Sequence, residues 1–144
     1  LDVNVLVAAF RADHPHHRPA SNWLGQQIAD QTPLALVPMV AAGFLRLVSS
    51  RRVFPDAAPP ALAVAFIDAL LAQAGTQWSA AREEWRTLKD LCLDKRLAGN
   101  DVPDAWLAAT VVGLGEHLVT FDAGFRRLLA RRQLTVLAAS QRPG

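Results

Sequence analysis

His117–Gly124, which reads HLVTFDAG, contains a short, mostly apolar run that ends just before Asp122. Such a run, bounded by turn-forming residues, predicts a buried β-strand over His117–Thr120. Helical patterns lie on both sides of it. A short strand between two helices is the repeating unit of an α/β domain, so this stretch decides the fold class.

The rest of the chain alternates helical and strand patterns in the same way. Helices are predicted at Asn4–Phe10, Pro19–Ile28, Pro38–Val48, Leu62–Gln73, Ala81–Leu93, from Pro103 to Gly113 or Gly115, and at Gly124–Ala130. Short strands are predicted at residues 1–3, Leu34–Val37, Thr76–Trp78 and Leu134–Leu137. The alternation predicts an α/β domain with a largely parallel sheet. The sequence contains no repeat or linker, so residues 1–144 are expected to form one domain.

The composition is typical of one globular domain, because 51% of the 144 residues are hydrophobic and 19% are charged. A net charge of +2 allows an anionic partner without requiring one. Cys92 is the single cysteine, so an internal disulfide and a cysteine-based zinc site are excluded and a cytoplasmic location is expected. The longest uncharged stretch, Gln31–Leu45, is shorter than the roughly 20 apolar residues of a membrane-spanning helix.

Three aspartates fall where strands are predicted to end or helices to begin. Asp2 ends the first predicted strand, Asp122 follows the His117–Thr120 strand, and Asp104 lies in the first turn of a helix. Because strand C-termini and helix N-termini meet along one edge of a parallel sheet, the three carboxylates are predicted to converge. Converging carboxylates repel one another unless a cation lies between them, and Mg²⁺ or Mn²⁺ prefers oxygen ligands.

Some of these acids also have purely structural interpretations. Asp104 can stabilise the start of its helix, Asp122 can serve as a turn residue, and Asp101 is favoured as a helix cap. Asp2 is different, because a charge within an apolar opening is costly to bury without a partner.

Three stretches that contain these aspartates resemble the signature motifs of PIN-domain ribonucleases. They are Leu1–Leu6 (LDVNVL), Asp104–Ala109 (DAWLAA) and Thr120–Phe125 (TFDAGF). Further likeness to bacterial VapC-type toxins lies in Gly43–Val48 (GFLRLV), Arg52–Pro55 (RVFP), His14–His17 and Trp23. The order and spacing of the motifs over nearly the whole chain make the resemblance fairly specific.

The resemblance implies a three-layer α/β/α PIN fold with a central, mostly parallel sheet. It also implies an endoribonuclease dependent on Mg²⁺ or Mn²⁺, the toxin of a type II toxin–antitoxin system, which cuts tRNA or another structured RNA. A VapB-type antitoxin and a homodimer are the implied partners. Carried over by position, Asp2, Asp104 and Asp122 are the catalytic and metal-binding residues, and Asn4 and Thr120 support them.

Two positions depart from the family pattern. PIN nucleases usually carry a glutamate around residues 40–43, yet no acid occurs between Asp30 and Asp56. A second acid often lies two residues after the one that matches Asp122, and Gly124 occupies that position here. Asp101 is a candidate to compensate. The alternative function is a degraded PIN-like module that binds RNA or protein without cleavage.

Arginines are candidates for RNA binding, because guanidinium groups pair with phosphate oxygens. Arg46 is the best single candidate. The other candidates can instead be ordinary solvated surface residues, and they are Arg11, Arg51, Arg52, Arg126, Arg127, Arg131 and Arg132.

Two other chemistries are less favoured. His14, His16 and His17 suggest zinc, but beyond Asp13 nothing nearby completes a tetrahedral set, so the start of a solvated helix is preferred. Phosphoaspartyl phosphatases need a second aspartate where this chain has Asn4. These phosphatases and receiver domains also need a lysine after a later strand. The two lysines of this chain, Lys89 and Lys95, instead fall in or just after a predicted helix.

The large apolar residues are predicted to pack in a core or an interface rather than to stack on bases. They include Trp23, Trp78, Trp85 and Trp106 and the helical face Leu62-Phe66-Leu70.

Overall fold

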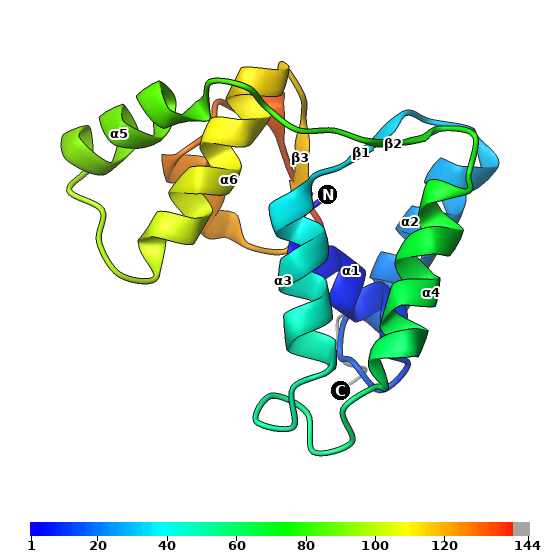
Figure 1. The fold of residues 1–144 in the computed structure, drawn as a ribbon. Coiled ribbons are helices and arrows are strands. Elements are labelled where there is room, and N and C mark those ends of the chain that lie inside the picture. The colour runs from blue at the N-terminus through cyan, green and yellow to red at the C-terminus, as the bar shows by residue number, and fades with distance from the viewer. Residues whose placement is uncertain (140–144) are drawn as a thin grey trace. The chain divides into compact units, whose positions relative to one another are not determined.

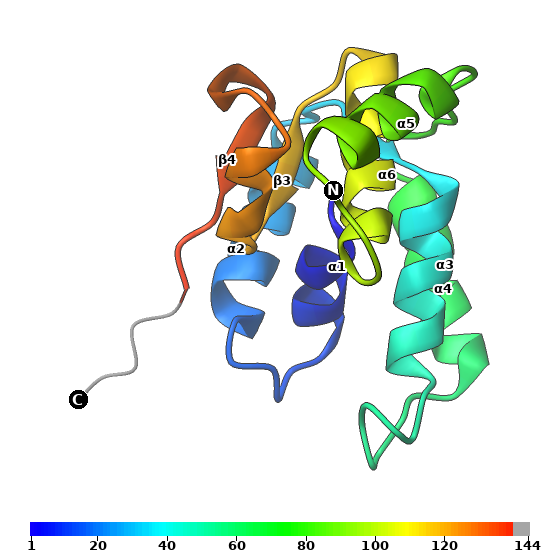
Figure 2. The same ribbon diagram turned by 90° about the vertical axis from the view of Figure 1, so that its left-hand side faces the viewer.

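The computed structural model describes residues 1–139 and divides them into two compact units. The first unit contains residues 1–79 and the described residues after 136, and the second contains residues 80–136. Both combine helices with short strands (Figures 1 and 2). Over residues 1–139, no helix is long and apolar enough to cross a membrane.

The first unit is built on an almost entirely apolar helix, α1 (Val3–Phe10). It packs against α2 (His17–Ala29) and α3 (Pro38–Val48), and α3 packs against α4 (Pro60–Leu71) (Figure 1). The rings of Phe10 in α1 and Phe66 in α4 lie 5.4 and 5.3 Å from the ring of Phe44 in α3, which is fully buried. This aromatic cluster joins α1, α3 and α4 in one core.

A short parallel sheet completes the first unit. Strand β1 (Leu34–Leu36) pairs with β2 (Thr76–Trp78), and Leu34 lies opposite Thr76. The proline that follows β1 and Val37 begins α3 directly, because its fixed backbone angle suits the first turn of a helix.

The second unit packs α5 (Glu84–Asp94) against α6 (Asp101–Leu114) and adds a second parallel pair of strands. Strand β3 (Leu118–Thr120) pairs with β4 (Leu134–Val136), and Leu118 lies opposite Leu134. Two 3₁₀ turns, η1 (Ala123–Arg127) and η2 (Arg131–Gln133), connect these strands. Gly115 ends α6 with a φ of 65°, a left-handed conformation that favours glycine.

Helices and parallel strands in alternation confirm the predicted α/β class. The predicted strand at residues 1–3 is wrong, because Asp2 caps α1 and the helix begins at Val3. The predicted helix Gly124–Ala130 is a shorter 3₁₀ turn, η1. Among the described residues the strands form two separate parallel pairs, one in each unit.

Several large apolar side chains lie outside the core, so for these residues packing in an interface stays a prediction. Trp78, Trp85 and Trp106 are 54%, 69% and 43% exposed. Leu62 is 58% exposed, whereas Leu70 on the same helix is buried. No residue of helix α5 is fully buried: Trp85 and Leu93 are exposed, and its other apolar residues are half-buried.

Candidate active site

Asp2 lies at the N-terminus of α1, where its side chain caps the helix. Its Oδ1 accepts a hydrogen bond of 2.6 Å from the backbone N–H of Val3, and only 8% of the residue is exposed. The N-terminus of a helix carries partial positive charge and unpaired N–H groups, both of which favour a carboxylate. Asn4 is half-buried in the first turn of the same helix.

Asp104 lies in the first turn of α6 and is half-buried. Asp101 is the first residue of that helix, and its carboxylate forms an ion pair of 2.5 Å with Arg127. Both positions are favourable for acids because of the helix dipole. The ion pair of Asp101 connects α6 with η1, and its role as a supporting acid stays a prediction.

Asp122 follows β3 and is oriented from two sides. Its backbone N–H donates to Oγ1 of Thr120 at 2.9 Å, and its Oδ1 accepts from the N–H of Gly124 at 2.7 Å. Thr120 is fully buried, so this hydroxyl is a fixed support. Asp122 is exposed and lies two residues after the end of β3.

At two of the positions that depart from the family pattern, Gly124 and Gly43, the local packing is tight. A Cβ atom at Gly124 would lie 2.9 Å from Oδ1 of Asp122, so any side chain there would disturb that carboxylate. A Cβ at Gly43 would lie 3.0 Å from Cγ2 of Val3, because α1 and α3 approach closely at that point. Val40 and Ala41, on the same helix, are buried in the core.

The acids are distributed over both units: Asp2 belongs to the first, and Asp104 and Asp122 belong to the second. In neither unit do the described residues contain three or more His, Cys, Asp or Glu side chains placed to hold one metal ion. The donor chemistry does fit Mg²⁺ or Mn²⁺, because all three predicted ligands offer carboxylate oxygens.

The sequence model of the PIN domain family matches residues 1–129 of the chain. The chain belongs to the PIN-domain family. Ribonuclease VapC31 of Mycobacterium tuberculosis is 37% identical to this PIN-domain chain over 135 residues, which are 93% of the chain and 95% of the relative. Ribonuclease VapC43 of the same species is 38% identical over 128 residues, which are 88% of this chain and 87% of the relative.

A solved structure shares the PIN fold. It is described as the crystal structure of VapBC2 from Rickettsia felis bound to a DNA fragment from their promoter. The similarity covers 94% of this chain and 96% of that one, with a TM-score of 0.64 and 17% sequence identity. The resemblance to VapC-type PIN domains in the sequence is therefore confirmed, and so is the expected fold.

The arginines of this PIN domain separate into buried and exposed groups. Arg11 is 7% exposed, stacks 4.0 Å above the ring of Phe54, and binds Asp13 and Asp56 at 2.8 Å each. It is therefore occupied by contacts within the first unit. Arg46 is exposed in the last turn of α3. The arginines of η1 and η2 are exposed as well.

The Arg11 cluster is the part of the PIN domain that sequence reasoning missed. Hydrogen bonds from Arg11 lower the pKa of Asp13, and those with Asp13 raise the pKa of Arg11. The partner Asp56 lies 45 positions away along the chain, so no local pattern could indicate the contact. The sequence indicates only the local part of the cluster, in which Arg11 and Asp13 are two residues apart.

Three of the four histidines, His14, His16 and His17, lie before and at the start of α2. All three are half-buried, so the predicted solvated helix start is only partly correct. Nδ1 of His17 lies 2.9 Å from the carbonyl oxygen of Ala8, which connects α2 to α1. Burial, together with the nearby His16, lowers the pKa of His14, so this side chain is neutral at pH 7.

Proposed function

We propose that this chain is an endoribonuclease that uses Mg²⁺ or Mn²⁺ to hydrolyse phosphodiester bonds, in tRNA or another structured RNA. We further propose that it is the toxin of a type II toxin–antitoxin system. The observation that carries the proposal is the likeness to VapC ribonucleases along 93% of the chain. The family model spans residues of both units, which supports the prediction that the chain acts as one PIN domain.

Asp2, Asp104 and Asp122 are the proposed metal-binding and catalytic residues. A divalent ion held by these carboxylates would polarise a phosphoryl oxygen and lower the pKa of a bound water. The chain's own residues prepare the ligands. The start of α1 holds the carboxylate of Asp2, and Thr120 with Gly124 orients Asp122. Asn4 and Arg46 are proposed to assist, as a polar support and as an RNA contact.

A VapB-type antitoxin is the proposed partner, and a homodimer in the cytoplasm is the proposed active form. The description of the R. felis structure names a VapBC assembly, which supports an antitoxin partner here. The exposed tryptophans of the second unit offer apolar surface for such contacts.

The experiment that tests the function is an RNA cleavage assay with purified protein and total RNA. Cleavage is expected with added Mg²⁺ or Mn²⁺ and is expected to stop with EDTA. Asp104→Asn and Asp122→Asn keep side-chain size and should abolish cleavage. Asp68→Asn, an exposed acid on α4, is the matched control and should cleave like the native protein.

The second candidate, a module that binds without cleaving, is favoured by one observation. No acid occurs in α3, where the family usually carries a glutamate. Absence of chelator-sensitive cleavage at every protein concentration, in a protein that still binds RNA, would establish this alternative and refute the nuclease.

A further inference from the structure

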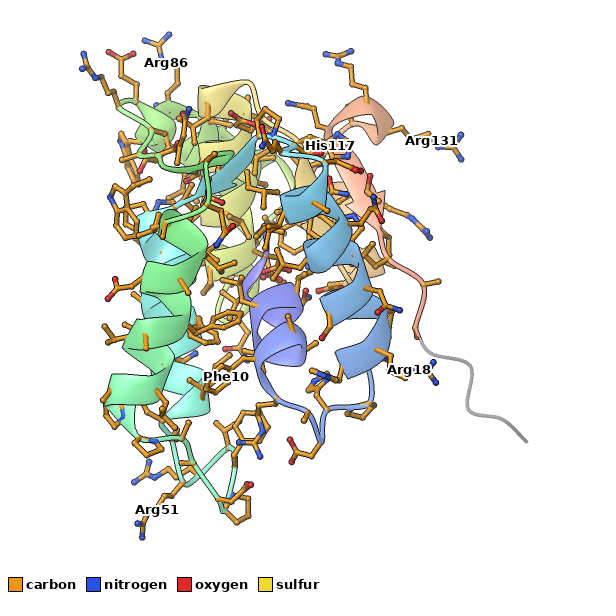
Figure 3. All side chains as sticks on the ribbon, turned by 90° about the vertical axis from the view of Figure 1, so that its right-hand side faces the viewer. Phe10, Arg18, Arg51, Arg86, His117 and Arg131 are labelled. Carbon is orange, nitrogen blue, oxygen red and sulfur yellow. The ribbon has the colours of Figure 1, made fainter. Side chains whose placement is uncertain are left out.

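A basic cleft lies in the second unit beside the η1 and η2 turns. It has a volume of about 480 Å³ and is lined by Arg126, Leu129, Arg131, Leu134 and Val136. Its volume is within the range of ligand sites in proteins, roughly 300–1,000 Å³. Figure 3 shows Arg131 extending outward from the turn that contains η2.

We propose that this cleft binds the phosphate backbone of RNA next to the cleaved bond, through Arg126 and Arg131. The inference rests on the proposed nuclease function and assigns a substrate-binding subsite to it. Guanidinium groups suit the role, because they are permanently charged and donate paired hydrogen bonds to phosphate oxygens.

The charge distribution supports an anionic ligand. Between residues 121 and 136 the chain carries four arginines, and Asp122 is the only acid. Asp101 of α6 forms an ion pair with Arg127, so the charge of this third arginine is already compensated. Among residues 1–139, no ion pair engages Arg126 or Arg131, so both guanidinium groups are available for a ligand.

The backbone that carries these arginines is held in place. Nδ1 of His117, just before β3, lies 2.9 Å from the carbonyl oxygen of Arg132, and its Nε2 lies 2.7 Å from Oγ1 of Thr135. Phe125 and Leu129 are buried and anchor the segment that carries Arg126. A fixed backbone reduces the conformational entropy that a charged side chain loses when it binds.

The chemistry of the cleft and its place in the chain favour RNA over an acidic protein segment. Arg126 belongs to η1, the 3₁₀ turn that Asp122 caps, and lies four residues after this proposed catalytic carboxylate. The apolar side chains of Leu129, Leu134 and Val136 offer a surface for ribose or base faces between the charged groups. A positively charged groove that follows the phosphate backbone is a feature of proteins that bind single-stranded nucleic acids.

The test measures RNA affinity separately from cleavage. Asp104→Asn serves as the non-cleaving background, and binding of a short fluorescent single-stranded RNA is followed by anisotropy in EDTA, with bulk tRNA as competitor. The double variant Arg126→Ala/Arg131→Ala is expected to weaken binding about tenfold at low salt. The negative slope of log K against log salt should become shallower by about 1.4, because each lost phosphate contact contributes about 0.7 for a single strand.

Two matched variants control for total charge. Arg82→Ala/Arg86→Ala removes two exposed arginines from the same unit and should change affinity less than about twofold. Arg126→Lys/Arg131→Lys should keep the native salt slope, because it keeps both charges. In the cleaving protein, Arg126→Ala/Arg131→Ala should raise KM far more than it lowers kcat.

If Arg126→Ala/Arg131→Ala binds the RNA as tightly as Arg82→Ala/Arg86→Ala does, the proposal is overturned. Native RNA affinity combined with lost binding of an acidic peptide would also overturn it and assign the cleft to a protein partner. If Asp104→Asn still cleaves RNA, the metal-site assignment is refuted. The RNA affinities of the arginine variants, measured in EDTA, would still decide the role of the cleft.

Discussion

Replacing Asp2 separates its helix-capping role from its proposed catalytic role. Asp2→Ala removes the acceptor of the 2.6 Å hydrogen bond from Val3 N–H and the negative charge at the start of α1. Loss of a capping side chain costs about 1 kcal/mol, and loss of the charge at the helix N-terminus costs about 0.5 kcal/mol more. Asp2→Asn keeps a carbonyl oxygen that can accept the same bond, so only the smaller charge contribution is lost.

Urea unfolding measures these free energies, and the RNA cleavage assay measures function. The free energy of unfolding should therefore fall by about 1.5 kcal/mol in Asp2→Ala and by about 0.5 kcal/mol in Asp2→Asn. Both variants should lose cleavage by at least about 100-fold, because neither offers a carboxylate to a metal ion. If Asp2→Asn cleaves like the native protein, the metal assignment is wrong. If both variants lose the same stability, the capping argument is wrong.

The remaining predictions concern the stability of each unit. Phe44→Ala should lower the free energy of unfolding by about 4 kcal/mol in urea titrations, because a fully buried ring and its two ring contacts are lost. Arg11→Met should cost about 2 kcal/mol at pH 7, since the stacking on an aromatic ring and two ion pairs disappear. The depressed pKa of Asp13 contributes stability that is present above its unfolded pKa of 3.8 and lost as pH falls through its folded value. Native stability should therefore decrease below about pH 4, and Arg11→Met should decrease less; identical pH profiles would contradict this. Gly115→Ala should cost about 1 kcal/mol at its positive φ, whereas Gly25→Ala, which meets nothing within 4 Å, should gain about 0.5–1 kcal/mol by thermal unfolding.

Two helix boundaries marked by proline or glycine were predictable from the sequence, whereas α2 and α6 begin two residues before the predicted Pro19 and Pro103. Pro38 begins α3 as predicted, and Gly115 follows the last residue of α6. These residues act through their own backbone angles, which do not depend on distant contacts. The placement of Asp104 in a first helical turn and of Asp122 after a strand was predictable for the same local reasons.

The start of the chain was not predictable in the same way. The helix Asn4–Phe10 was predicted, but residues 1–3 were predicted as a strand, because so short an apolar start fits a strand as well as the beginning of a helix. The exposure of Trp85 and Trp106 was equally hidden, because hydrophobicity alone does not show whether another element covers a helix face.

The sequence by itself determined the order of helices and parallel strands, the family, and the local positions of the three aspartates, since all of these depend on short-range patterns. Only the tertiary structure decided which arginines are available to a ligand. Arg11 and Arg126 are indistinguishable as residues, yet Arg11 is buried against Phe54 and paired with Asp56, while Arg126 lines an open cleft. The physical reason is that burial and ion pairing depend on residues that are distant in sequence and meet only after folding.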